Sequence, residues 1–138
     1  MRNSVVRVAL AILALVSAEL GFWAAFAPRS FFDDYPGLGR HWVRVDGPYS
    51  EHLVRDFGAL NLALAVVTVV ALITLGRPLV IAVAIAWLAW GIPHLVYHLR
   101  HLDVFSTGDK VANVVGLVAV PVLAVVVLVL MLPRPARA

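Results

Sequence analysis

A cluster of histidines lies near the end of the third long apolar segment of this 138-residue chain. His94, His98 and His101 follow i, i+4, i+7 spacing, so on a helix they share one stripe, and Tyr97 lies beside them. Imidazole changes charge near neutral pH and is a common metal ligand, so this stripe suits a metal or haem site or a proton relay. Histidines that only form hydrogen bonds at a membrane interface are the structural alternative.

The second apolar segment opens with polar residues at helical spacing. Glu51 and Arg55 are four residues apart, as are His52 and Asp56, which predicts two side-chain pairs on adjacent faces. Asp56 and Asn61 lie deeper and should point into the protein, because lipid offers these side chains no partner. If the second and third segments are neighbours, the candidate metal ligands are His52, Asp56, His94 and His98.

Glu19 is a carboxylate about two thirds of the way along the first apolar segment. An ionisable side chain at membrane depth costs a few kcal/mol at least, so each one is a candidate functional residue. Glu19 could take up and release a proton or anchor a ligand, or it could form a structural pair with Arg55 or a histidine. The candidate ligand or proton site therefore comprises Glu19, His52, Asp56, His94 and His98, followed by Asn61, Tyr97 and His101.

Membrane-spanning helices are the elements that must position these residues. Hydrophobic residues make up 62% of the chain and charged residues 14%, against about 25% charge in ordinary soluble domains. This composition excludes a water-soluble enzyme, and the lack of cysteine excludes thiolate metal sites, disulfides and thiol redox centres. A bilayer core requires about 20 apolar residues per helix, and four segments approach this length, near residues 5–27, 52–75, 79–100 and 109–132.

Breaks between these segments predict how they connect. Gly76, Arg77 and Pro78 leave room only for a tight turn, so the second and third spans should be antiparallel neighbours. Ser50 and Thr107 are expected N-caps of the second and fourth spans. The sequence predicts an all-α fold, a single transmembrane domain over residues 1–138, built as a four-helix up-and-down bundle. Residues 28–50 form its long loop, expected at the lipid headgroups because aromatic and charged residues are mixed there.

Basic residues indicate the orientation of the chain. One end of the bundle has no acidic residue but carries Arg2, Arg7, Arg77, Arg134 and Arg137, whereas bases at the other end are interleaved with acids. The positive-inside rule therefore predicts a multi-pass cell-membrane protein with both termini in the cytoplasm. The candidate polar residues then gather at the extracytoplasmic end. No soluble basic face remains for nucleic-acid binding.

Three stretches give the chain a resemblance to the DoxX-like superfamily of small four-helix membrane proteins, particularly its little-characterised actinobacterial members. They are residues 21–32 (GFWAAFAPRSFF), 41–61 (HWVRVDGPYSEHLVRDFGALN) and 93–98 (PHLVYH). The resemblance implies a bundle of four spans, sometimes associated with membrane redox or thiol-stress systems. It implies no set of catalytic residues.

We expect a ligand-binding or accessory module with a polar histidine and carboxylate pocket, rather than an enzyme. A metal- or haem-dependent oxidoreductase component and a proton-coupled transporter that uses Glu19 are the alternatives. Expected partners are the lipid bilayer and a small apolar ligand or a membrane protein. Small residues such as Gly58 or Gly116 also allow a homodimer.

Overall fold

A computed structural model describes residues 1–133 of the chain. Arg134 and Arg137, two of the basic residues used to predict the orientation, lie outside this range. Four long helices dominate: α1 (Arg2–Phe26), α3 (Glu51–Thr74), α4 (Arg77–Leu99) and α5 (Thr107–Met131). All four are long and apolar enough to cross a membrane, which confirms the all-helical membrane fold class. Their bounds lie close to the four predicted spans.

The connection between α1 and α3 contains more regular structure than the expected loop. Residues Pro28–Asp34 form a short helix, α2, and Pro36–Gly37 (β1) pairs antiparallel with Arg40–His41 (β2). Pro28 is the first residue of α2, where its fixed φ and missing N–H suit a helix start. Residues 36–37 are therefore a strand, and the hairpin turns at Leu38 and Gly39, which both have positive φ.

Two serine caps start the later helices. The Ser50 hydroxyl accepts a hydrogen bond from the backbone N–H of Leu53, as the sequence predicts. At α5 the cap is Ser106 and not Thr107, because the Ser106 hydroxyl lies 3.2 Å from the backbone nitrogen of Asp109. A short 3₁₀ helix, η1 (Leu102–Val104), connects α4 to this cap.

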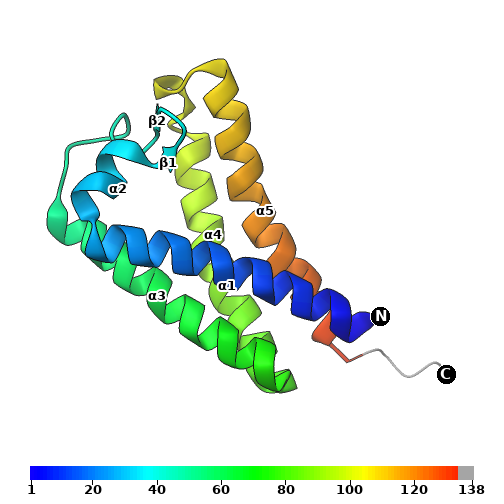
Figure 1. Cartoon of the computed structure of the whole chain (residues 1–138). Coiled ribbons are helices and arrows are strands. Elements are labelled where there is room, and N and C mark those ends of the chain that lie inside the picture. The colour runs from blue at the N-terminus through cyan, green and yellow to red at the C-terminus, as the bar shows by residue number, and fades with distance from the viewer. Residues whose placement is uncertain (134–138) are drawn as a thin grey trace.

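The long helices associate as two pairs, α1 with α3 and α4 with α5 (Figure 1). We call the end with the N-terminus, the α3–α4 turn and the last turn of α5 the turn end, and the end with α2 and the strands the loop end. At the turn end one hydrophobic core joins all four helices, and Trp87 on α4 is fully buried within it. At the loop end the buried cluster comes from α1, α2 and α3. The pairs therefore meet at the turn end and separate toward the loop end.

Glycines allow α1 and α3 to approach closely. A Cβ at Gly58 would lie 2.8 Å from the Cα of Ala25, and a Cβ at Gly21 would lie 2.8 Å from the backbone nitrogen of Leu62. Small residues let helix backbones come together where lipid supplies no hydrophobic driving force. Helices α1 and α3 therefore form a tightly packed pair, and the buried residues of α2 pack against it at the loop end.

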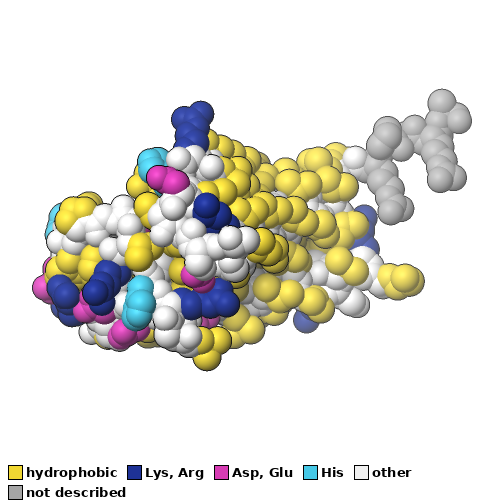
Figure 2. Space-filling model, turned by 90° about the horizontal axis from the view of Figure 1, so that it is seen from above, with side chains coloured by type: hydrophobic (Ala, Val, Ile, Leu, Met, Phe, Trp, Pro, Cys, Tyr) yellow, Lys and Arg dark blue, Asp and Glu magenta, His cyan; other side chains and the backbone are white. Residues whose placement is uncertain are grey.

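Most charged side chains gather over the loop end, a few basic ones lie toward the turn end, and the surface between them is mostly hydrophobic (Figure 2). Large apolar side chains such as Val66, Ile73 and Val129 are exposed along the helices. A soluble protein rarely exposes so continuous an apolar surface, and this band has the composition of a lipid-facing surface.

Candidate functional site

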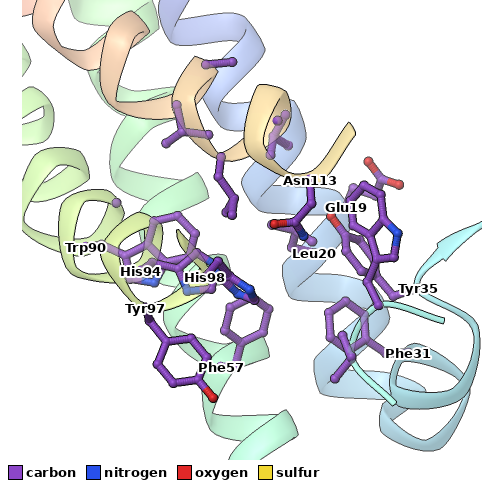
Figure 3. Close-up of a pocket in the computed structure, with 18 of the residues that line it drawn as sticks. Glu19, Leu20, Phe31, Tyr35, Phe57, Trp90, His94, Tyr97, His98 and Asn113 are labelled. Atoms are coloured by element: carbon purple, nitrogen blue, oxygen red, sulfur yellow. The ribbon is translucent and has the colours of Figure 1, made fainter. Parts of the chain in front are cut away.

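A cavity of about 660 Å³ lies between the two helix pairs. All four long helices, α2 and the segment after β2 contribute to its wall, which is mostly aliphatic and aromatic. Figure 3 shows Trp90, His94 and His98 on one side and Glu19 and Tyr35 across from them. The ionisable or amide side chains that line the cavity are Glu19, Tyr35, Asp46, His94, Tyr97, His98 and Asn113.

Aromatic rings on α4 form one wall of the cavity. The His94 ring stacks on Trp90 with centroids 4.9 Å apart, and the His98 ring meets His94 edge-on at 4.7 Å. Phe57 of α3 lies 6.4 Å from the His94 ring. The i, i+4 spacing therefore places His94 and His98 side by side, as the sequence indicates.

His101 and Tyr97 diverge from this wall. His101 lies beyond the end of α4, is exposed, and its Nδ1 is 2.7 Å from the Tyr97 carbonyl oxygen. The His101 ring stacks on the Tyr97 ring at 4.1 Å. Tyr97 lines the cavity but is also 45% exposed, so it lies at an opening between α3 and α4.

Two polar atoms in the cavity wall are buried without a hydrogen-bond partner. Within residues 1–133 these are Nδ1 of His98 and Oδ1 of Asn113. Asn113 is only 5% exposed, and buried polar atoms are nearly always paired. An unpaired amide oxygen beside an open volume therefore marks a position where an occupant can donate a hydrogen bond.

Glu19 and Tyr35 lie on the opposite side of the cavity. Glu19 lines it from α1 and is accessible, which places the carboxylate at an opening. Burial, and to a lesser extent the Glu19 charge, raises the pKa of Tyr35 above its ordinary value of 10.0. Tyr35 therefore stays a protonated phenol at neutral pH, able to donate as well as accept.

His52 and Asp56 lie outside the cavity. They form the predicted i, i+4 pair, with Nε2 and Oδ2 3.3 Å apart, and their side chains are 84% and 64% exposed. Glu51 and Arg55 form the other predicted pair at 2.8 Å. Asp56 thus does not point inward, and the four candidate metal ligands His52, Asp56, His94 and His98 do not line one cavity. Among the described residues, no group of three histidine or acidic side chains is placed to share a metal ion.

Asn61 is buried, as expected, but serves the contact between α1 and α3. Its backbone oxygen accepts a 2.7 Å hydrogen bond from the Ser17 hydroxyl, and its side-chain nitrogen donates to the Phe57 carbonyl oxygen at 2.9 Å. Both hydrogen bonds lie within the α1–α3 pair, so the buried amide has its partners there. Asn61 therefore holds the scaffold together and does not line the cavity.

Polar contacts of Asp109 with Trp42, Arg40 and Ser106 cover the loop end of the cavity, and we call this group of contacts the latch. The Trp42 indole N–H donates to Oδ1 of Asp109 at 2.9 Å, and Arg40 forms an ion pair with the same oxygen at 3.0 Å. The Ser106 hydroxyl donates to the other carboxylate oxygen at 2.7 Å. Because Trp42 also lines the cavity, these contacts hold the segment after β2 across it to the start of α5.

Three cavity residues, Tyr35, Asp46 and Phe57, were not predicted from the sequence as site residues. Asn113 does carry a signal in the sequence, because it is the one amide in the fourth apolar run and could complete a polar network there. Comparisons with protein-family models, curated proteins and solved structures found no match to this chain. The site is therefore assigned from its own geometry.

Proposed function

We propose that this chain is a multi-pass protein of the cell membrane that binds a small, largely apolar molecule in the loop-end cavity. The observation that carries the proposal is the cavity itself, with its aromatic wall and the unpaired Asn113 and His98 atoms. Ligand sites typically enclose about 300 to 1,000 Å³ and combine apolar walls with a few polar groups. This cavity has both properties.

Exposed lining residues on the candidate membrane spans favour a ligand that arrives from the bilayer. Leu53 of α3 and Tyr97 of α4 line the cavity and are 66% and 45% exposed. Ile12 of α1, 41% exposed, and the accessible Gly116 of α5 form a second opening. The latch closes the water-facing end, so lateral entry between helices suits an apolar molecule.

Charge distribution supports the proposed topology. Within the described residues, the turn end carries Arg2, Arg7 and Arg77, and the acidic residues lie toward the loop end. By the positive-inside rule we place both termini in the cytoplasm, with the helices crossing alternately as an up-and-down bundle. The cavity then faces the extracytoplasmic side. The protein acts there as a binding or accessory module.

Single cysteines can test the cavity, because the natural chain has none. Gly116→Cys places a thiol on the wall, and Gly108→Cys places one on α5 outside the cavity; an added Cβ meets nothing within 4 Å at either position. The variants are labelled in nanodiscs with a methanethiosulfonate reagent, with and without 4-phenylbutan-1-ol. We expect the alcohol to slow labelling of G116C and leave G108C unchanged. Equal rates for G116C with and without saturating alcohol contradict the proposal.

A further inference from the structure

The acidic and the unpaired polar groups of the cavity lining can accept hydrogen bonds. Its lining includes the acidic residues Glu19 and Asp46 and, among described residues, no lysine or arginine. Asn113 Oδ1 can only accept a hydrogen bond, and His98 Nδ1 accepts in the tautomer that carries its proton on Nε2. An occupant that matches this wall supplies N–H or O–H donors.

Neither carboxylate forms an ion pair with a basic side chain of the described residues. The acidic partners in its ion pairs are Asp33, Asp109, Asp56 and Glu51, so Glu19 and Asp46 have none within residues 1–133. Glu19 also lies within a membrane-spanning helix, where an unpaired carboxylate is costly. A positively charged occupant removes that cost, whereas an anionic one adds to it.

Aromatic rings on both sides of the cavity suit an amphipathic cation. The π-face of Tyr35, on the same side as Glu19, attracts an ammonium group that is shielded from water, while Trp90 on α4 can pack against an apolar body. The aliphatic part of the lining, including Leu117 and Leu123, accommodates an apolar body. Neutral alcohols satisfy the acceptor atoms and the apolar wall, but they leave both carboxylates without a counter-charge.

We propose that the occupant is an amphipathic amine, bound as its cation, with the ammonium group between the Glu19 carboxylate and Asn113 Oδ1 and its apolar body against the α4 rings. This inference rests on the proposed function and names the chemical class of its ligand. Charge selects the amine over an alcohol of the same shape. Hydrogen bonding to Asn113 selects a primary amine over a quaternary one, which has no N–H.

A matched ligand series tests the inference. Labelling of the G116C thiol is measured with 4-phenylbutylamine, its N,N,N-trimethyl derivative, 4-phenylbutan-1-ol and 4-phenylbutanoate, with each concentration corrected for measured partition into the nanodisc bilayer. We expect half-maximal protection by the primary amine at a concentration at least about 10-fold lower than by the alcohol. The trimethyl compound should lie between them and the carboxylate should protect least.

Two substitutions assign the selectivity to residues. Glu19→Gln in the G116C background should abolish the preference for amine over alcohol while protection by the alcohol is retained. Asp56→Asn removes a carboxylate outside the cavity and is the matched control, so the preference should persist. Asn113→Leu should remove the advantage of the primary over the trimethyl amine.

The outcomes separate this inference from the proposed function. Equal protection by amine and alcohol overturns the cation assignment and leaves a binding cavity. Failure of all four compounds to protect overturns both. Because the series is measured first without substitutions at Glu19, Asn113 or Asp56, it remains decisive even if one of those variants does not fold.

Discussion

Gly58→Ala tests whether α1 and α3 form the tight pair that supports the cavity. An added Cβ would lie 2.8 Å from the Cα of Ala25 and 2.9 Å from the carbonyl carbon of Ala24. Both neighbours are backbone atoms of a continuous helix, so they cannot rotate away as a side chain can. The two helices must therefore move apart along this contact.

The expected loss of stability follows from two opposing effects. Overpacking a close contact costs about 1 to 3 kcal/mol, and the upper value applies here because backbone must move. Alanine in a helix interior is favoured over glycine by about 0.5 to 1 kcal/mol. We therefore expect a net loss of about 2 kcal/mol, roughly a 30-fold change in the unfolding equilibrium constant.

Equilibrium unfolding by SDS in mixed micelles, followed by far-UV circular dichroism, measures this loss. Gly116→Ala is the control, because its added Cβ meets nothing within 4 Å and only the helix preference remains. We expect this control to be as stable as the natural chain or slightly more stable. If Gly58→Ala matches the control, α1 and α3 do not approach as closely as described and the reasoning is refuted.

Three further perturbations test the core, the latch and the buried phenol. Trp87→Phe removes the 2.9 Å hydrogen bond from the indole N–H to the Thr68 hydroxyl, and should lower the free energy of unfolding in SDS by about 1 to 3 kcal/mol. An unchanged unfolding midpoint would show that this hydrogen bond does not stabilise the core. Asp109→Ala removes the acceptor of Trp42 and should speed hydrogen exchange across residues 40–46, whereas unchanged exchange argues against the latch. Tyr35 should ionise above pH 10.0, because burial disfavours the phenolate. An alkaline titration followed at 295 nm measures this, and the Tyr35→Phe variant identifies the signal of Tyr35. Ionisation at or below pH 10.0 would show that the phenol is accessible to water.

Hydropathy and helical spacing predicted the elements and some local pairs. Long apolar runs between glycine, proline and serine breaks gave the four helices, since the bilayer fixes their length. The i, i+4 rule gave the contact of His94 with His98 and the pair of His52 with Asp56. Pro28 also offered a signal for α2 that the aromatic composition of the loop obscured.

The sequence could not show which polar residues share the cavity. In a membrane protein the lipid-facing and interior sides of a helix are both apolar, so hydropathy barely fixes the rotation of the helix about its axis. His52 and Asp56 consequently lie outside while Asn113 lies inside, although all three are near the loop end. The contact of Trp42 with Asp109 joins positions far apart in sequence, and no local pattern encodes it.

Photocrosslinking most directly tests whether the cavity is a binding site. A 4-phenylbutylamine derivative that carries a diazirine on its ring is irradiated with the natural chain in nanodiscs, and the adducts are located by mass spectrometry. We predict adducts on the cavity residues Phe57, Trp90 and Leu117 that excess unmodified amine suppresses. Adducts confined to the outward-facing Val66, Ile73 and Val129, unaffected by that excess, would contradict the existence of a site.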